Sequence, residues 1–539
     1  MLWRIPLLLL FVAAAAGCTS GGGEASTDAD ADADVDGLVV ELELVDDHAL
    51  VGRLVVESDE PVRPQIEVVG TERSFEIPVA GPASRHEIPV VGLRAEHDYQ
   101  VSVSVGEEVV EADLRTGALP DRLPELRIAT AEPGEMSEGF TVFNVLGLPE
   151  GDPPSEGLAI AVDPEGEVVW YHRTDHPIGD LRQLEDGTIL HEYNDTGARR
   201  IDLFGETLEE WGGDIIMGPL RLDAYERQVV GEGATEVATD SMHHEVGMLD
   251  NGNLVAVSSE LRTYDGFAGP LCGEGEDFDG SYDLIVDVIV EFQPDGTVVA
   301  EYPLADHLDP VARASDQNVC GLPFDDVFPN WLYRAQGEAD ALDWTHANAV
   351  VPDPSGAAFT VSVRHLDAIL QIDRATGELL WRFGPGGDLE VAHPSDYPSH
   401  QHAPEWQDDG TLLVYDNGNT RAPGPDDPAD VERTSRAVRY RIDPDAGTAE
   451  VVWSYTATVD GEPAYASFVG DADRMANGNV LMTNGGYADR PDQVSAQIVE
   501  VVPDDSPAGG RIVFDLRLDH PDQPIIYRAE RVETFYPAG

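Results

Sequence analysis

From Leu38 onward, apolar and polar residues alternate in short stretches such as LVVELELV, HEIPVVGL and YQVSVSVG, which Pro, Gly and Asp separate. Alternation of this kind is typical of β-strands that bury one face. The stretches continue to about Thr116, and Pro120 and Pro124 follow them. We therefore predict a small β-sandwich domain over residues 37–120, followed over residues 121–156 by a linker and the strand that leads into the next domain.

From residue 157, two kinds of segment recur. One is an apolar strand next to a D-G or N-G turn, as in RQLEDGTILHEY, GMLDNGNLVAV and DRMANGNVLMTN; the other is a hairpin such as IDLFGETLEEW or IDRATGELLWRF. Hairpin pairs that repeat without helices are typical of a β-propeller. Pairing the units predicts five blades, at 178–212, 243–303, 345–385, 401–456 and 466–517. A strand near 158–171 and the C-terminal stretch IIYRAERVETFY complete a sixth. The predicted fold is all-β, a six-bladed β-propeller over residues 157–539 preceded by the sandwich.

The first residues, MLWRIPLLLLFVAAAAGCTS, combine Arg4 with an apolar run and small residues before Cys18. This arrangement predicts a lipoprotein signal peptide over residues 1–18, with a lipidated Cys18. Residues 19–36 are rich in Gly and Asp and hold almost no large apolar residue, so we predict a flexible tether there. The expected location is the periplasm, with the lipid anchor in the bacterial outer membrane or at the cell surface.

Two further cysteines, Cys272 and Cys320, lie in the long segment between Leu261 and Asp343. An even pair in an oxidising compartment predicts one disulfide. We expect the segment to be a loop that this disulfide closes. The N-terminal sandwich is a candidate surface for a homodimer.

The charge balance excludes several classes of protein. The chain has 103 acidic and 32 basic residues and a formal net charge of −71 at pH 7. A general nucleic-acid binder needs clustered positive charge, so no nucleic-acid partner is expected. None of the basic residues is a lysine. This absence excludes a Walker-type phosphate loop, a pyridoxal Schiff base and a lysine nucleophile.

Three histidines occupy one position in successive predicted blades. His244 lies eight residues before the turn residue Gly252, and His402 lies eight residues before Gly410. His346 lies ten residues before its own turn glycine, which fits the same position with a two-residue insertion. Because the first strand of each blade lines the propeller axis, we expect these imidazoles to converge at one mouth of the channel.

Other residues are expected at the same mouth. Asn348 follows His346 by two residues on the same strand face, and Arg364 falls on the next strand. Imidazoles, a guanidinium and an amide without a carboxylate in equivalent positions favour a site for an oxyanion. Three histidines can also hold zinc, but an arginine beside them would repel a dication. We therefore expect an anion site with no metal and no cofactor.

The strings MHHEVGMLDNGN, DWTHANAVVPDPSG with SVRH, and QHAPEWQDDGTLLVYDNGN with SRAVRYRIDP resemble the bacterial arylsulfate sulfotransferases. The resemblance covers most of the chain from about residue 40. It implies a periplasmic six-bladed propeller that moves a sulfuryl group from an aryl sulfate donor to a phenolic acceptor. The implied route is ping-pong, through a covalent sulfohistidine, without a nucleotide donor or a metal.

The resemblance also implies roles for individual residues. His402 would be the nucleophile, and His244, His346 and Arg364 would bind the sulfuryl oxygens or handle the phenolic proton. Asn348 and Ser467 would complete the pocket. His243 replaces His244 if the register is wrong by one, and His400 is close enough to exchange roles with His402. Two other functions stay open: a non-catalytic propeller that binds partners, and a metal-dependent hydrolase.

Overall fold

The structure is a computed structural model, and it describes residues 33–536 apart from 36, 47, 72, 149–155, 175, 194–195, 218–232, 269–278, 311–331, 334–340, 425–432, 488–493, 505, 507 and 519–523. Cys18, Cys272 and Cys320 lie outside the described residues, so lipidation and the disulfide stay predictions. The described part of the chain holds no helix that is long and apolar enough to cross a membrane.

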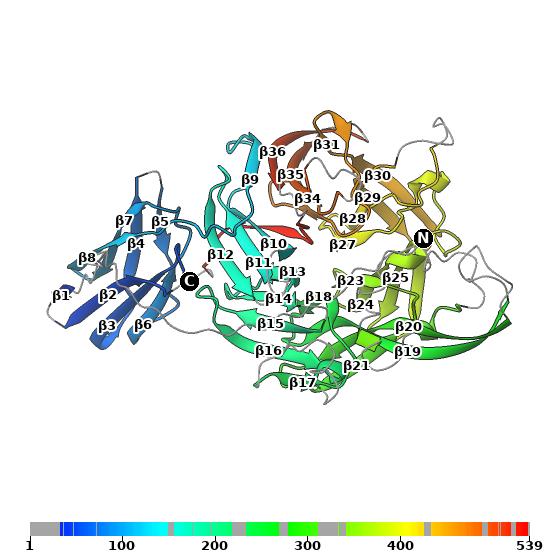
Figure 1. Ribbon diagram of the computed structural model, residues 1–539, viewed down its shortest axis with the longest axis horizontal. Coiled ribbons are helices and arrows are strands. Elements are labelled where there is room, and N and C mark those ends of the chain that lie inside the picture. The colour runs from blue at the N-terminus through cyan, green and yellow to red at the C-terminus, as the bar shows by residue number, and fades with distance from the viewer. Residues whose placement is uncertain are drawn as a thin grey trace, which may run out of the picture.

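The N-terminal domain is a sandwich of two four-stranded sheets, at the left of Figure 1. One sheet has the order β1 (Ala33–Val35), β2 (Leu38–Leu44), β3 (Gly52–Val62) and β6 (Ala83–Val90). The other has the order β5 (Ser74–Ile77), β4 (Gln65–Gly70), β7 (Asp98–Val105) and β8 (Glu108–Arg115). Alternate residues of β2, β4 and β8 are buried, as the sequence pattern predicts. β1 falls within the segment that was predicted to be a flexible tether. The prediction missed this strand because its backbone pairs with β2, and such pairing does not require large apolar side chains.

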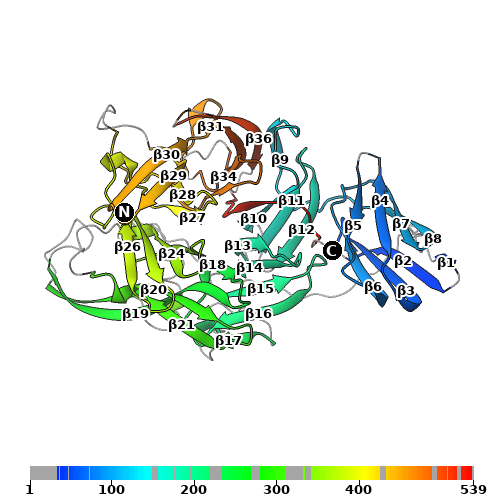
Figure 2. The same ribbon diagram turned by 180° about the vertical axis from the view of Figure 1, so that it is seen from behind.

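Six sheets around a common axis form the propeller (Figures 1 and 2). Blade 1 consists of β37 (Ala529–Val532), β10 (Phe140–Leu148), β11 (Glu156–Val162) and β12 (Val168–Thr174). Blade 2 consists of β13 (Ile178–Gln183), β14 (Ile189–Tyr193), β15 (Gly197–Ile201), β16 (Thr207–Gly213) and β17 (Thr235–Val237). Blade 3 consists of β18 (His243–Met248), β19 (Leu254–Ala268), β20 (Asp279–Phe292) and β21 (Val298–Pro303), and β22 (Leu342–Asp343) pairs with β20.

The other three blades follow the same plan. Blade 4 consists of β23 (Ala347–Pro352), β24 (Ala358–Val363), β25 (Ala368–Asp373) and β26 (Leu379–Phe383). Blade 5 consists of β27 (His402–Trp406), β28 (Thr411–Asp416), β29 (Arg436–Asp443) and β30 (Thr448–Tyr455). Blade 6 consists of β33 (Asp471–Arg474), β34 (Val480–Asn484), β35 (Ala496–Pro503), β36 (Gly510–Leu518) and β9 (Leu126–Ala131). The predicted six-bladed fold class is confirmed.

Apart from the sandwich and the blades, the described residues hold only short elements. They are α1 (Asp214–Met217), the 3-10 turns η1 (Leu304–Asp306), η2 (Arg364–Leu366) and η3 (Pro394–Asp396), and the hairpin of β31 (Thr458–Val459) and β32 (Glu462–Pro463).

The ring closes at two places. In blade 1 the C-terminal strand β37 pairs with β10, and in blade 6 the early strand β9 pairs with β36. Residues 121–156 were predicted as a linker with one leading strand, but they contribute strands to both of these blades. The pairing partners of β9 and β10 are distant in sequence, so local patterning did not reveal them.

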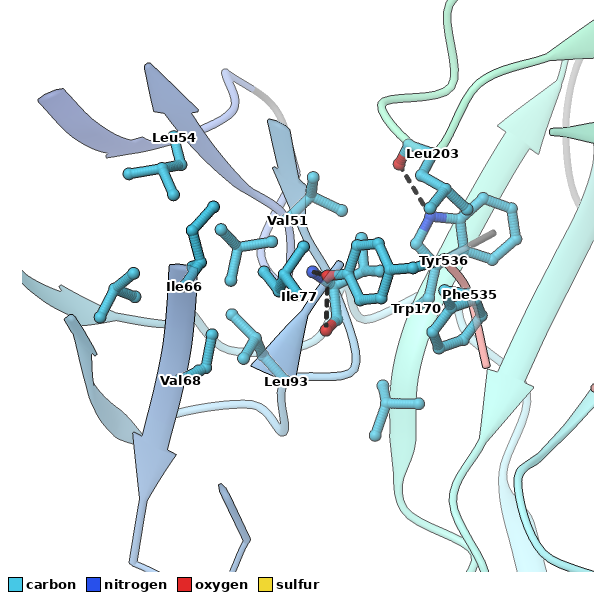
Figure 3. Close-up of a cluster of buried hydrophobic side chains, with 14 of the residues drawn as sticks. Val51, Leu54, Ile66, Val68, Ile77, Leu93, Trp170, Leu203, Phe535 and Tyr536 are labelled. Atoms are coloured by element: carbon cyan, nitrogen blue, oxygen red, sulfur yellow. Dashed lines mark hydrogen bonds between the residues drawn. The ribbon is translucent and has the colours of Figure 1, made fainter. Parts of the chain in front are cut away.

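The two domains share one apolar core, drawn in Figure 3. Trp170, Phe535 and Tyr536 of the propeller are buried against the sandwich. The Tyr536 hydroxyl accepts a hydrogen bond from the Val91 N–H at 3.0 Å and donates one to the Pro89 carbonyl at 3.0 Å. The C-terminal residues therefore both close the propeller and hold the sandwich on it.

Candidate active site

The innermost strands bring residues of blades 3, 4 and 5 together at one end of the axis. His244 lies on β18, His346 directly precedes β23, and His402 begins β27. The ring centroids of His244 and His346 are 4.8 Å apart, and the ring of Tyr527 is 6.1 Å from that of His244 and 6.4 Å from that of His402. We call His244, His346, His402 and Arg364 the imidazole cluster.

The backbone is irregular where it presents these residues. His244 and His346 have φ of 60° and 48°, in the left-handed region that residues other than glycine seldom adopt. The pairing registers of β18, β23 and β27 also shift near these residues. Irregular pairing and strained φ angles re-aim side chains and are frequent at functional sites. The histidines therefore do not simply follow the alternation of regular strands.

The cluster does not extend into blade 6. The equivalent position there is Gly470, with φ of 114°, and a Cβ atom at this place would overlap the ring of Tyr415. Only glycine fits such a position. The imidazoles therefore gather on one side of the channel.

His402 is held in one tautomer. Its Nδ1–H donates to Oδ1 of Asn417 at 2.7 Å. The Asn417 amide cannot turn around, because its Nδ2 donates to the backbone carbonyls of Ala466 at 2.8 Å and Val469 at 2.9 Å. With the proton on Nδ1, the lone pair of His402 is on Nε2, which is the nucleophilic form of the ring.

Burial keeps two of the cluster histidines, His244 and His402, uncharged. It lowers the pKa of His402 well below 6.5, and the guanidinium of Arg364 lowers it further. Burial is also the main reason that the pKa of His244 is well below its usual value, with added contributions from the His346 ring and Arg364. Burial lowers the pKa of Arg364 itself to about 10, so this side chain remains a cation at neutral pH.

Arg364 is the fixed positive charge of the site. It begins η2 directly after β24, and its backbone N–H donates to the His346 carbonyl at 3.1 Å. Its Nη2 donates to the backbone carbonyl of Ser467 at 3.1 Å. Ser467, which the resemblance assigned to the pocket, therefore contacts Arg364 through its backbone carbonyl.

Asn348 lies next to the cluster and is fully buried. Its Nδ2 donates to the Gln401 carbonyl at 2.8 Å, and its backbone carbonyl accepts from the Tyr527 hydroxyl at 3.3 Å. Its Oδ1 is buried without a hydrogen-bond partner among the described residues. A buried acceptor without a partner destabilises the folded protein unless a ligand or water donates a hydrogen bond to it. Asn348 can therefore accept a hydrogen bond from a hydroxyl such as that of a phenol.

The adjacent residue His243 lies behind the cluster. Its Nδ1 is 2.7 Å from Nδ1 of His244, and its Nε2 is 3.3 Å from Oδ1 of Asp287 on β20. The Asp287 carboxylate also accepts from the Thr345 hydroxyl at 2.6 Å. It is therefore the ring of His244, and not that of His243, that contacts His346 and Tyr527.

A second carboxylate backs His346. Asp343 accepts a hydrogen bond from Nδ1 of His346, and Nδ1 of His365 lies 3.7 Å from the same carboxylate. These three are the residues of the described chain whose ligand atoms lie close enough for a metal ion, within 4.8 Å of one another. Two ligands of one tetrahedral zinc lie about 3.3 Å apart. The Asp343–His346 contact is shorter than that, and Arg364 opposes a dication nearby. The group is a hydrogen-bonded cluster and fits a metal poorly.

Deeper in the channel the inner strands carry acidic residues. Arg528 donates to Asp180 at 2.9 Å and to Glu245 at 3.0 Å. Burial raises the pKa values of Glu405 and Glu530 to about 7. Asp180 and Glu245 are therefore paired with Arg528, and Glu405 and Glu530 hold a proton below about pH 7.

Sequence reasoning missed four of these residues. Asp343 precedes His346 by three positions, and this spacing was a usable signal. Asp287 lies on β20, the third strand of blade 3, and Asn417 follows β28, the second strand of blade 5. Tyr527 lies in the C-terminal segment that closes the ring. No spacing in the sequence connected these three residues to the histidines.

The protein is thus a six-bladed propeller whose inner strands bring three histidines and an arginine together at one end of the axis. The chain belongs to the arylsulfotransferase family, because the model for arylsulfotransferase (ASST) matches residues 127–528, more than half of the chain. This membership supports aryl sulfotransferase activity in general. No curated protein matches the chain.

Several solved structures are similar in outline only. A protein of unknown function from Bacteroides caccae is 14% identical, with a TM-score of 0.40, over 73% of this chain and 98% of that one. A putative 6-phosphogluconolactonase from Bacteroides uniformis is 10% identical, with a TM-score of 0.34, over 87% and 100% of the two chains. The Cps50 (Swd1) β-propeller domain from Myceliophteria thermophila is 12% identical, with a TM-score of 0.32, over 72% and 88%.

Proposed function

We propose that this protein transfers a sulfuryl group from an aryl sulfate donor to a phenolic acceptor in two half-reactions, with His402 as the covalent carrier. The observation that carries the proposal is the hydrogen bond from Nδ1 of His402 to Asn417. It leaves the lone pair of a neutral imidazole on Nε2, beside the charge of Arg364. No cofactor takes part in the proposed route.

In the first half-reaction, Nε2 of His402 attacks the sulfur of the donor. The bond between sulfur and the aryl oxygen breaks, and the oxygen leaves with the electron pair and receives a proton. In the second half-reaction, the acceptor oxygen attacks the sulfur and loses its proton. The bond between nitrogen and sulfur then breaks, and His402 regains its lone pair.

Charge on the sulfuryl oxygens is stabilised by donors that are already in place. Transfer of this kind resembles phosphoryl transfer, in which positioning and fixed positive charge provide most of the catalysis. Arg364 supplies the charge, and ring nitrogens of His244 and His346 lie beside it. Asn348 offers its unpartnered Oδ1 to the phenolic hydroxyl.

The test combines turnover with detection of the adduct. Purified protein with 4-nitrophenyl sulfate and phenol should release nitrophenol and form phenyl sulfate. Brief exposure to the donor alone should add one sulfuryl group to His402, as peptide mass spectrometry would show. His402→Ala should lose both signals, and His307→Ala, at the histidine that follows η1, should keep them. Turnover by His402→Ala at the parent rate would overturn the proposal.

We also propose that the protein is anchored in the periplasm through lipidated Cys18 and that Cys272 and Cys320 form a disulfide. The signal-like N-terminus and the even cysteine pair support these assignments. A fatty-acid label should enter the parent but not Cys18→Ser. Thiol alkylation should modify Cys272 and Cys320 only after reduction; alkylation without reductant would contradict the disulfide.

A further inference from the structure

The three histidines of the imidazole cluster have different hydrogen-bond partners at Nδ1. His402 faces the neutral amide of Asn417, and His244 faces the ring of His243. His346 faces a carboxylate directly, since its Nδ1 donates to Oδ2 of Asp343. A carboxylate stabilises an imidazolium far better than an amide or a second imidazole does. Within this cluster, His346 is therefore the ring best suited to carry a proton.

Asp343 is held rigidly in this position. It ends β22, which pairs in parallel with β20 through Leu284 and Ile285. The next residue, Trp344, is fully buried and donates its backbone N–H to Ile285 at 3.1 Å. The aspartate is thus placed by blade 3, although the histidine that it contacts leads into blade 4.

His365 restricts His346 from the other side. The two rings are stacked at 4.6 Å with an angle of 25° between their planes. Nδ1 of His365 is 3.2 Å from the backbone carbonyl of Asp343 and 3.7 Å from its carboxylate. With Asp343 at Nδ1 and His365 on one face, the orientation of the His346 ring is determined, and Nε2 is its remaining polar atom.

We propose that Asp343 is a positioning residue that makes His346 the proton-transfer group for the phenolic oxygen in both half-reactions. The proposal rests on the function proposed above and assigns the proton that the mechanism must move. A positioned carboxylate fixes the histidine tautomer and stabilises the cation, as in other histidine–aspartate pairs.

The proton balance is complete within the two half-reactions. His346 begins protonated on both nitrogens, opposite the Asp343 carboxylate. When the bond between sulfur and the aryl oxygen breaks, Nε2 of His346 gives its proton to that oxygen and the ring becomes neutral. When the acceptor phenol attacks the sulfohistidine, its proton moves to Nε2 and the imidazolium is restored. No other oxidant, reductant or base is required.

This arrangement indicates a substrate class. A donor with a weakly basic leaving group, such as 4-nitrophenyl sulfate, departs readily as the phenolate. A donor with an unactivated phenol, such as phenyl sulfate, gains most from a proton donor. We therefore infer that the site is built for sulfate esters of unactivated phenols.

The test is the dependence of Asp343→Asn on the leaving group. Donor kcat/KM is measured in the parent and the variant with 4-nitrophenyl sulfate and with phenyl sulfate, at saturating acceptor. The loss with phenyl sulfate should exceed the loss with 4-nitrophenyl sulfate by tenfold or more. His346→Gln should give the same unequal losses, and adding Asp343→Asn to it should not widen the ratio.

Asp287→Asn is the comparison variant, because the Asp287 carboxylate contacts His243, the Thr345 hydroxyl and the Ala347 N–H but makes no contact with the His346 ring, so it does not hold the proton of that ring. Its losses should be equal for the two donors. Thermal denaturation of each variant separates a folding defect from a catalytic one, and the ratio of two donors is independent of the folded fraction. Equal losses in both Asp343→Asn and His346→Gln would overturn the proposal. A sulfuryl adduct that persists in His402→Ala would instead overturn the proposed function.

Discussion

Nδ1 of His402 donates a hydrogen bond to Oδ1 of Asn417 at 2.7 Å, and two backbone carbonyls prevent the amide of Asn417 from turning around. The nucleophilic nitrogen is thus selected by a residue at the end of the neighbouring strand β28. Sheet pairing of His402 with Tyr415, two residues before Asn417, sets this distance.

Replacing Asn417 by Leu should reduce transfer about a hundredfold or more, because the ring is then free to place its proton on Nε2. Single-turnover formation of the His402 adduct measures the effect. Asn419→Leu is the control within the same segment. Asn419 donates to the Ser467 carbonyl at 2.8 Å and has no hydrogen bond to His402, so its loss should be clearly smaller. Equal losses would contradict the role of Asn417.

The rate of adduct formation should not fall as the pH drops through 6.5. An imidazolium cannot attack, but burial and Arg364 hold the pKa of His402 well below 6.5, so protonation begins only at more acidic pH. Asn417→Asp places a carboxylate at Nδ1 and should raise this pKa, which moves the acid limb of the pH profile upward. A parent profile with its midpoint near 6.5 would contradict the buried, neutral state.

The free energy of unfolding should fall between about pH 5 and pH 8, in part because of Glu530. Burial raises the pKa of Glu530 from 4.5 to about 7, so in this window the folded chain binds the proton that the unfolded chain has released. Protonation then favours the folded state at low pH, and this stability is lost as the pH rises to about 7. In Glu530→Gln, the decrease in the free energy of unfolding between about pH 5 and pH 8 should be about 1–3 kcal/mol smaller than in the parent.

The measurement is urea denaturation at about pH 5 and about pH 8. Glu533→Gln changes an exposed carboxylate three residues away and should leave the pH dependence as it is in the parent. A Glu530→Gln variant with the parent's pH dependence would show that Glu530 is ionised in the folded protein.

Tyr536→Phe should destabilise the contact between the sandwich and the propeller by about 1–2 kcal/mol. The change removes the hydroxyl that accepts from Val91 and donates to Pro89, and it leaves both backbone groups without this partner. Transfer activity should be unchanged, because Tyr536 packs in the domain interface and its hydroxyl bonds residues of the sandwich. Limited proteolysis and thermal denaturation would report the effect, and an unchanged melting temperature would contradict it.

Much of the fold could be predicted because its signals are local. Alternating residues and D-G or N-G turns define strands without reference to the rest of the chain, and their repetition indicates blades. The strand β9 and the pairing of β37 with β10 were not fully predictable. Each of these strands pairs with the edge of a sheet whose other strands lie far away in the sequence. β1 was missed for a related reason, because this short part of an Asp-rich segment is recognised as a strand only through its backbone pairing with β2.

For the candidate site, the sequence alone was enough to assign the histidines to their blades, because distance from a turn glycine is preserved along a strand. It also indicated Arg364 and Asn348, which lie close to His346 in the chain. Which nitrogen of each ring is left for a substrate became clear only from the folded chain. That choice depends on Asn417, Asp287 and Asp343, which approach the rings from behind on other strands. Hydrogen-bond direction is a property of such through-space contacts, and no periodicity along a single strand encodes it.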